Sequence, residues 1–230
     1  MLVWSEMPAT YAFTADAVEN FTQEWLAIVR QNYSHPCIIT WTPFNESWGV
    51  PDIRTKKEQQ AFTEGIYYLT KSLDPMRPVI TNDGWEHTVS DIITLHDYEE
   101  DGDTFRERYA DKDKITGGEI YHNKFRRAMA DDCSYKGQPI ILSEYGGIAF
   151  SSKQDGEWGY GNPVTNEETF LARYRKITDA IRSVPYICGY CYTQVSDVEQ
   201  EVNGLLTAER EYKIAPEKIA AVNADKADPQ

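Results

Sequence analysis

Hydrophobic and polar positions along the chain follow two alternating patterns. Short apolar runs that stop at turn residues predict buried strands, and longer stretches with apolar residues three or four positions apart predict amphipathic helices. The six predicted strands span residues 2–6, 37–44, 78–81, 92–95, 139–144 and 186–193. Because helices separate most of these strands, the pattern predicts an α/β fold with a parallel sheet. Polar groups follow five or six of the strands, which favours a barrel over a doubly wound sheet.

Helices are predicted from capping residues and from apolar spacing. Three residue pairs have the spacing of a capping box and would begin helices: Asp16 with Glu19, Thr55 with Glu58, and Thr165 with Glu168. In the polar stretch at 99–132, the spacing of Tyr121, Phe125 and Met129 indicates one helix. We expect a loop up to Asn162, a loop after residue 193, and a frayed tail at 220–230. Residues 1–219 would then form one partial barrel domain.

Two of the predicted strands end in glutamate. Side-chain alternation puts Glu46 on one face with Phe44 and Thr42, and Glu144 on one face with Leu142. Parallel sheets keep their chemistry at the carboxyl ends of their strands, so two such carboxyl groups can meet across the mouth of a barrel. A separation of about 5 Å suits a glycosidase that retains the anomeric configuration, whereas about 9 Å suits inversion. We expect the shorter distance.

Aromatic and amide side chains near the strand ends are expected to bind a sugar. Asn45 would hydrogen-bond a sugar 2-hydroxyl, and Tyr98 would donate to the Glu144 carboxylate. Tryptophan side chains would supply stacking faces. The candidate substrate-binding residues are Asn45, Trp48, Asn82, Trp85, His96, Tyr98, Trp158 and Gln194.

The charge balance narrows the range of partners. The chain has 23 basic and 37 acidic residues, a formal net charge of −14, which argues against nucleic acids and anionic membranes. No run approaches the roughly 18 apolar residues that span a bilayer. The start at Met1 lacks the layout of a signal peptide, so we expect a cytoplasmic protein, with any leader belonging to a missing upstream part.

Cysteines and clustered acids suggest no cofactor. The four cysteines are too few for a disulfide scaffold. Cys188 and Cys191 lie in an apolar run, where a spacing of three sends their thiols to opposite faces, and we expect them to pack in the core. The acidic residues between Asp97 and Asp103 match no metal-binding loop, so a solvated loop is expected. Neither a metal nor an organic cofactor is predicted.

Four segments resemble glycoside hydrolase family 2 in the order of that family. Residues 35–49, HPCIITWTPFNESWG, resemble its acid/base segment, and residues 141–147, ILSEYGG, resemble its nucleophile segment. Residues 192–205 are similar to its last barrel strand and the loop after it, and residues 2–8 to its third strand. The resemblance implies a (β/α)8 TIM barrel and retaining β-glycosidase chemistry, with Glu46 as acid/base and Glu144 as nucleophile.

The chain departs from this family by lacking counterparts of the first two barrel strands and of the preceding β-sandwich domains. Six strands cannot close an eight-stranded barrel, so the strands at 2–6 and 186–193 would be edges without their usual partners. We expect a piece of a longer enzyme; the alternative is that another chain fills the gap. The edges would be paired with another chain, covered by rearranged segments or frayed, and self-association is possible there.

Several activities remain open. The leading expectation is a retaining, β-galactosidase-like enzyme that removes terminal β-linked sugars. Within the family, β-glucuronidase and β-mannosidase are alternatives. A uronate would need a basic partner, and the absence of a basic residue beside the two glutamate motifs argues against β-glucuronidase. A catalytically inactive carbohydrate-binding or structural remnant is the alternative from another class.

Overall fold

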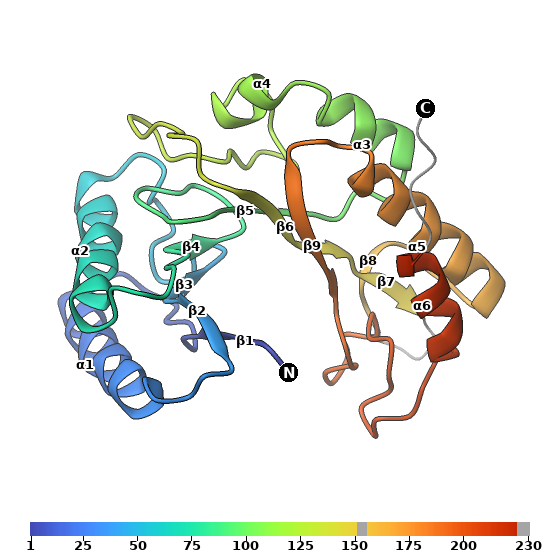
Figure 1. The fold of residues 1–230 in the computed structure, drawn as a ribbon, viewed down its shortest axis with the longest axis horizontal. Helices are drawn as coiled ribbons and strands as arrows, with labels where there is room; N and C mark the ends of the chain where they lie inside the picture. The colour runs from blue at the N-terminus through green and yellow to red at the C-terminus, as the bar shows by residue number, and fades with distance from the viewer. Residues whose placement is uncertain (151–155, 225–230) are drawn as a thin grey trace. The chain divides into compact units, whose positions relative to one another are not determined.

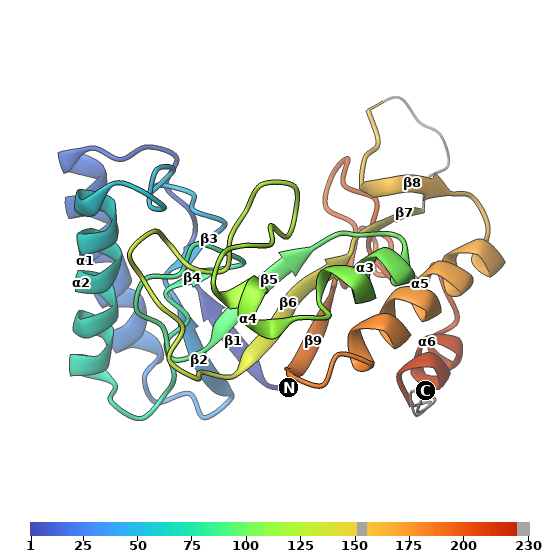
Figure 2. The ribbon, with the colours of Figure 1, turned by 90° about the horizontal axis from the view of Figure 1, so that it is seen from above.

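The computed structural model describes residues 1–150 and 156–224 (Figures 1 and 2). The chain divides into two compact units, and the boundary falls within two strands and one short helix. The first unit is Met1–Leu95 with Asp113–Ile141, and the second is His96–Lys112 with Leu142–Gln230. Among the described helices, none combines the length and the apolar character needed to cross a membrane.

The first unit consists of short parallel strand pairs and two long helices. Its elements are β1 (Val3–Glu6), α1 (Ala15–Asn32), β2 (Ile38–Thr42), β3 (Phe44–Asn45), α2 (Lys57–Leu73), β4 (Asn82–Asp83) and α4 (Lys112–Thr116). β1 pairs with β2, and β3 pairs with β4, both in parallel. Of the predicted strand at 78–81, only Val79 pairs, in an isolated parallel bridge with Trp41 of β2, and strand structure begins at Asn82 in β4. The Trp41 N–H donates to the Pro78 carbonyl at 3.1 Å.

The helices of the first unit bury an aromatic core against these strands. Figure 1 shows α1 and α2 side by side. The fully buried Trp25 of α1 donates from Nε1 to Thr70 Oγ1 of α2 at 2.8 Å. Its ring meets that of Trp41 edge to face, and Phe21 stacks on Phe44 with centroids 4.5 Å apart. Burial of rings of this size supplies most of the stability of such a layer.

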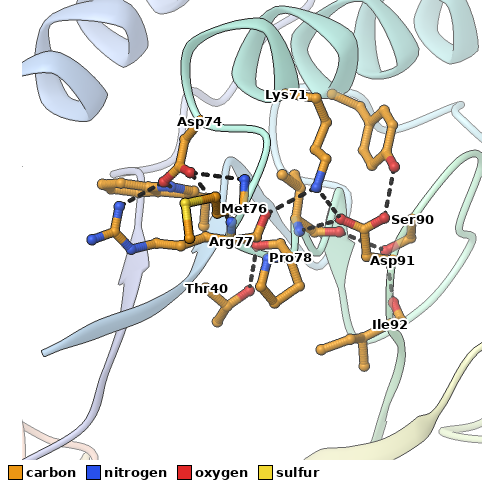
Figure 3. Close-up of polar contacts among 12 residues, drawn as sticks. Thr40, Lys71, Asp74, Met76, Arg77, Pro78, Ser90, Asp91 and Ile92 are labelled. Atoms are coloured by element: carbon orange, nitrogen blue, oxygen red, sulfur yellow. Dashed lines mark hydrogen bonds and ion pairs between the residues drawn. The ribbon is translucent and has the colours of Figure 1, made fainter. Parts of the chain in front are cut away.

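Two carboxylates fix the segment between α2 and β5 (Figure 3). Asp91 accepts hydrogen bonds from Val79 N at 2.8 Å and from Lys71 Nζ at 3.1 Å. Asp74, just after α2, is 1% exposed and accepts from Trp41 Nε1 at 2.9 Å and from Arg77 Nη1 at 2.6 Å. The buried charge of Asp74 needs such partners, and the partly buried Asp91 accepts from the Val79 backbone, so these two aspartates fix the path of the chain that leads to β4.

The second unit surrounds the strand that carries Glu144. Its elements are α3 (Gly102–Arg108), β7 (Ile148–Phe150), β8 (Tyr160–Val164), α5 (Glu167–Arg182), β9 (Ile187–Thr193) and α6 (Pro216–Ala224). β5 (Ile93–Asp97) and β6 (Ile140–Gly146) begin in the first unit, and the sheet order is β5-β6-β9. α3 packs on α5, as Figure 2 shows. A Cβ on Gly102 would lie 2.8 Å from the Lys176 carbonyl oxygen, so this approach requires glycine.

The strands form an incomplete barrel. The described strands make four separate sheets and no closed barrel. Within the described residues, β1 is bonded to β2 alone and β9 to β6 alone, so each lies at the end of its sheet, as expected for edge strands. The prediction that Cys188 and Cys191 pack in the core is wrong. Both are exposed, because no strand follows β9 in the sheet order to cover them.

The helix starts differ from those predicted by capping boxes. Thr14 caps α1 by accepting from Ala17 N at 3.1 Å, and Asn166 caps α5 by accepting from Thr169 N at 2.9 Å. Lys56 occupies the N-cap of α2, with no side-chain cap bond. There Thr55 is already used in a turn, in which its N–H donates to Asp52 O at 3.0 Å. A cap must be extended and must directly precede the first turn, and sequence spacing alone does not reveal this.

Three further segments correct the predicted pattern. No helix runs through 121–129; Phe125 is 62% exposed, so the spacing there did not mark a core face. The loop up to Asn162 contains β7 and β8, which pair in parallel, while residues 151–155 lie outside the described residues. The whole described part of the predicted tail, residues 220–224, belongs to α6, whose Ile219 and Val222 pack with Phe170, and residues 225–230 lie outside the description.

Candidate active site

The first unit carries Glu46 on a tight turn directly after β3. The Glu46 N–H donates to the Asp83 carbonyl at 2.9 Å, and Trp48 N donates to the Asn45 carbonyl at 2.9 Å. Glu46 and Ser47 have φ values of 51° and 60°, in the left-handed region. Each costs roughly 1–2 kcal/mol relative to ordinary helical geometry. Other contacts must therefore hold this turn in place.

The Ser47 side chain supplies those contacts. Its Oγ donates to Glu86 Oε2 at 2.9 Å, and it accepts from Asn82 Nδ2 and from Trp85 Nε1, both at 3.1 Å. Asn82 Oδ1 also accepts from Ser47 N at 2.9 Å. Glu86 is 3% exposed, and Arg126 Nη1 donates to it at 3.1 Å while its guanidinium lies 4.6 Å from the centroid of the Trp85 ring. Asn82 and Trp85 thus act on the turn that carries Glu46.

Two other side chains of this unit differ from Asn82 and Trp85. Among the described residues, the buried Oδ1 of Asn45 has no hydrogen-bond partner. Trp48 is 49% exposed, and its ring meets that of Tyr11 edge to face with centroids 5.5 Å apart. By contrast, Asn82 is fully buried and Trp85 is 5% exposed. Their predicted contact with substrate stays a prediction.

The second unit surrounds the Glu144 carboxylate with polar groups from two neighbouring strands. The Tyr98 hydroxyl, just after β5, and Thr193 Oγ1, at the end of β9, both donate to Glu144 Oε2, the latter at 3.3 Å. His96 Nε2 lies 3.8 Å from Glu144 Oε1. Hydroxyl donors stabilise the ionised form of a carboxylate, and an attacking nucleophile must be ionised.

Aromatic rings extend from this carboxylate. Tyr98 stacks on Tyr160 with ring centroids 3.5 Å apart and planes within 4°. Trp158 meets Tyr160 edge to face at 5.9 Å and is 47% exposed. Backbone bonds hold Trp158 to the loop after β9, since its N–H donates to the Gln200 carbonyl at 2.9 Å. This exposed face is suited to stacking on a sugar.

The loop after β9 is braced from within. Gln194 Nε2 donates to Asn203 Oδ1 at 2.8 Å, and the Tyr192 hydroxyl donates to the Asn203 carbonyl at 3.1 Å. Burial raises the pKa of the Tyr192 phenol, so this donor keeps its proton. Lys213 Nζ lies 2.7 Å from Asp197 Oδ1. The amide of Gln194 therefore serves this loop, and its role toward substrate stays a prediction.

The acidic stretch after β5 is not a solvated loop, contrary to expectation. Asp97 is 2% exposed, and each acid pairs with a base that the sequence reading did not connect to it. The ion pairs are Arg108 with Asp97 and Glu99, Arg106 with Asp103, Arg173 with Glu100, and Lys176 with Asp101 and Asp103. Arginines recur along α3 after a run of acids, and this pattern could have predicted pairing within that segment. Pairing with Arg173 and Lys176 of α5 could not be predicted from it.

The predicted site residues are divided between the two units. Asn45, Glu46, Trp48, Asn82 and Trp85 lie in the first unit, where hydrogen bonds join most of them around one turn. His96, Tyr98, Glu144, Trp158 and Gln194 lie in the second, where Tyr98 and His96 approach Glu144. The separation of the two catalytic candidates, Glu46 and Glu144, stays a prediction.

Parallel strands separated by helices, with carboxyl groups where the strands end, define an enzyme domain of the TIM-barrel class. The family comparison is more specific. Residues 10–223 match the family described as glycosyl hydrolases family 2, TIM barrel domain, and the chain belongs to this family.

Solved structures agree at the level of the fold. A β-glucuronidase from an uncultured Clostridium species is 18% identical with a TM-score of 0.65, and the match covers 97% of this chain and 40% of that enzyme's chain. A β-galacturonidase from Eisenbergiella tayi is 17% identical with a TM-score of 0.68, covering 100% and 42%. A β-glucuronidase from Bifidobacterium dentium is 19% identical with a TM-score of 0.67, covering 97% and 37%. The chain thus spans about 40% of the length of the first of these structures. No curated protein matches it.

Proposed function

We propose that the chain carries both catalytic carboxyl groups of a retaining β-glycosidase, with Glu144 as nucleophile and Glu46 as acid/base. The observation that carries the proposal is the environment of Glu144, where two hydroxyl groups donate to one carboxylate oxygen. Such donors favour the charged carboxylate that attacks a sugar. Membership of a glycosyl hydrolase family supports the same chemistry.

The reaction would proceed in two displacements. In the first, a Glu144 oxygen bonds to the anomeric carbon, the glycosidic C–O bond breaks, and Glu46 gives its proton to the departing oxygen. In the second, water attacks the anomeric carbon, Glu46 takes the proton of that water, and the bond to Glu144 breaks. Two inversions retain the β configuration. Asn45 would bind the 2-hydroxyl, and Trp48 and Trp158 would stack on the sugar or on the group that leaves.

A neutral sugar, as in a β-galactoside, is the proposed substrate. A uronate would need a free cation, whereas Arg108, Arg173 and Lys213 of the second unit each hold a carboxylate. In the first unit Arg126 is bound to Glu86. The second candidate is a β-glucuronide or β-galacturonide, favoured by the names of the similar solved structures.

Hydrolysis of a panel of 4-nitrophenyl β-glycosides tests this function. The galactoside should show a kcat/KM at least tenfold above the glucuronide, galacturonide and mannoside, and proton NMR should detect the β-anomer first. If a uronide is the best substrate, the proposal of a neutral sugar is wrong and the second candidate takes its place. First appearance of the α-anomer would contradict retention, and binding of sugar without hydrolysis would support an inactive carbohydrate-binding remnant.

A further inference from the structure

One arginine binds the two acids on either side of Tyr98. Arg108 Nη1 of α3 donates to both carboxylate oxygens of Asp97, at 2.8 and 2.7 Å. Its Nη2 donates to Glu99 Oε2 at 2.8 Å. Glu99 N donates to Asp97 Oδ1 at 3.0 Å, which closes a turn around Tyr98. The residue that contacts the candidate nucleophile is therefore held at both neighbours by a single guanidinium group.

The bond to Asp97 is the firmer of these anchors. Asp97 is 2% exposed, and the hydroxyl of Tyr109, itself 1% exposed, donates to its Oδ2 at 3.0 Å. A buried carboxylate keeps its partners, because separation would leave an uncompensated charge. A planar guanidinium serves two carboxylates with fixed directions, which a lysine ammonium does not.

We propose that Arg108 is a positioning residue, which holds the Tyr98 hydroxyl on the Glu144 carboxylate. The Tyr98 ring leads from the turn, across the face of Tyr160, to Glu144 Oε2, so a shift of the turn moves the hydroxyl. This inference rests on the proposed function of Glu144 as nucleophile. It assigns to α3 a task in the reaction in addition to packing against α5.

Arg106 offers a matched control on the same helix. Its Nη1 donates to Asp103 Oδ1 at 2.8 Å, and the Asp103 side chain is 72% exposed. Arg106→Lys makes the same arginine-to-lysine replacement at another position of α3 and leaves the turn around Tyr98 unchanged. Arg108→Lys keeps the charge but loses the forked geometry. Any difference between the two variants therefore comes from the clamp on Asp97 and Glu99.

Kinetics provide the first test, in whichever form of the protein hydrolyses an aryl β-glycoside. Arg108→Lys should lower kcat about 10- to 100-fold with KM within about twofold, because a displaced catalytic contact costs on this order. The acidic limb of the pH profile should move to higher pH, since the charged Glu144 loses a donor. Arg106→Lys should stay within about twofold.

A double variant separates positioning from general support of the fold. In a Tyr98→Phe background the hydroxyl is absent, so adding Arg108→Lys should lower kcat by less than about threefold. A further loss as large as in wild type would overturn the proposal. Should Arg108→Lys fail to fold, Glu99→Gln replaces it, since it leaves the Asp97 bonds intact, and the same pattern on a smaller scale is expected.

A tyrosine NMR measurement tests the positioning role of Arg108 without an activity assay. In protein with ring-labelled tyrosine, the signal absent from Tyr98→Phe belongs to Tyr98. That signal should shift in Arg108→Lys and stay in Arg106→Lys. An unmoved Tyr98 signal in Arg108→Lys would overturn the proposal. If the wild type hydrolyses no β-glycoside, the proposed function fails on that result, whereas the NMR comparison still tests the clamp.

Discussion

At the scale of single residues, Glu144 and Glu46 are held by different kinds of contact. Glu144 accepts from two hydroxyl groups, which favour its charge. Glu46 follows a buried strand on a turn whose backbone is fixed by Asp83 and by Ser47. A double displacement needs one carboxyl group that attacks and another that holds a proton, the roles proposed for Glu144 and Glu46.

Replacement of Glu46 should affect substrates according to their leaving groups. In Glu46→Gln the proton donor is lost, so alkyl glycosides should lose at least about 100-fold in kcat/KM. An aryl glycoside with an acidic phenol needs no proton and should still form the glycosyl-enzyme. Added azide should release that intermediate as a β-glycosyl azide, because a small anion needs no base. Equal losses for both leaving groups, with no azide product, would mean that Glu46 is not the acid/base.

Asp74 should contribute stability that depends on pH. Burial alone raises its pKa, but hydrogen bonds from Trp41 and Arg77 outweigh that effect and lower the pKa below 3.8. The folded state therefore favours the charged form, and the stabilisation is complete above pH 3.8 and is lost as the pH falls through the folded value. Asp74→Asn should lower the free energy of unfolding at pH 7 by about 2 kcal/mol.

Urea unfolding at several pH values checks this sign. Wild type should lose stability more steeply than Asp74→Asn as the pH falls below 3.8, so the two curves should converge in acid. Asp132→Asn is the matched control, because Asp132 pairs with Lys57 at the surface, where their side chains are 79% and 66% exposed, respectively. Parallel curves for wild type and Asp74→Asn would show that Asp74 has the same proton affinity folded and unfolded.

At the scale of elements, the turn after β3 depends on residues that the sequence separates widely. Ser47 reaches Asn82, Trp85 and Glu86, which lie 35 to 39 positions further along the chain. These contacts hold two residues in left-handed conformations directly before Trp48. We infer that the geometry of Glu46, the proposed acid/base, depends on this serine.

Ser47→Ala should therefore act on both stability and catalysis. The loss of one acceptor and donor among buried groups should cost about 1–3 kcal/mol in the free energy of unfolding. The kcat for alkyl glycosides should fall about tenfold, more than for aryl glycosides, because a misplaced acid matters most where a proton is needed. The exposed Ser72, which donates to the Leu69 carbonyl within α2, provides the control Ser72→Ala. Equal losses for both substrate types would contradict a role through Glu46.

The same scale shows what the sequence could reveal. Periodicity identified the main strands and the three long helices, since burial in this fold repeats regularly along the chain. Caps were misjudged, because Thr14 and Asn166 were recognisable only from the extended backbone before each helix. Strand-end position selected Glu46 and Glu144 as catalytic candidates, which stay predictions, but the Ser47 network and the Arg108 clamp depend on contacts between separate elements, which no local pattern encodes.

At the scale of the whole molecule, open strand edges should promote association. Within the described residues, β9 has one sheet neighbour. Its sequence, ICGYCYT, has no charged side chain, and Cys188 in it is exposed. Unpaired backbone groups on such an edge can bond to another copy. Sedimentation of the 230-residue chain should show a mass that rises with concentration.

A charge on the β9 edge should weaken this association. Cys188→Lys should lower the associated fraction at least about threefold, since edge lysines disfavour pairing. Tyr68→Lys, on the exposed face of α2, adds the same charge elsewhere and should change little. Equal effects of the two variants would assign the change to net charge, and a monomer at all concentrations would show that the edges are covered.

The central claim, that Glu144 forms a covalent bond to the sugar, has a direct test. A 2-deoxy-2-fluoro β-glycoside with a dinitrophenol leaving group forms the glycosyl-enzyme faster than water releases it. Peptide mass spectrometry of the labelled protein should find one sugar on the peptide with Glu144, and none in Glu144→Gln. A label on Glu46 or on another carboxylate, or rapid turnover that leaves no label, would contradict the account.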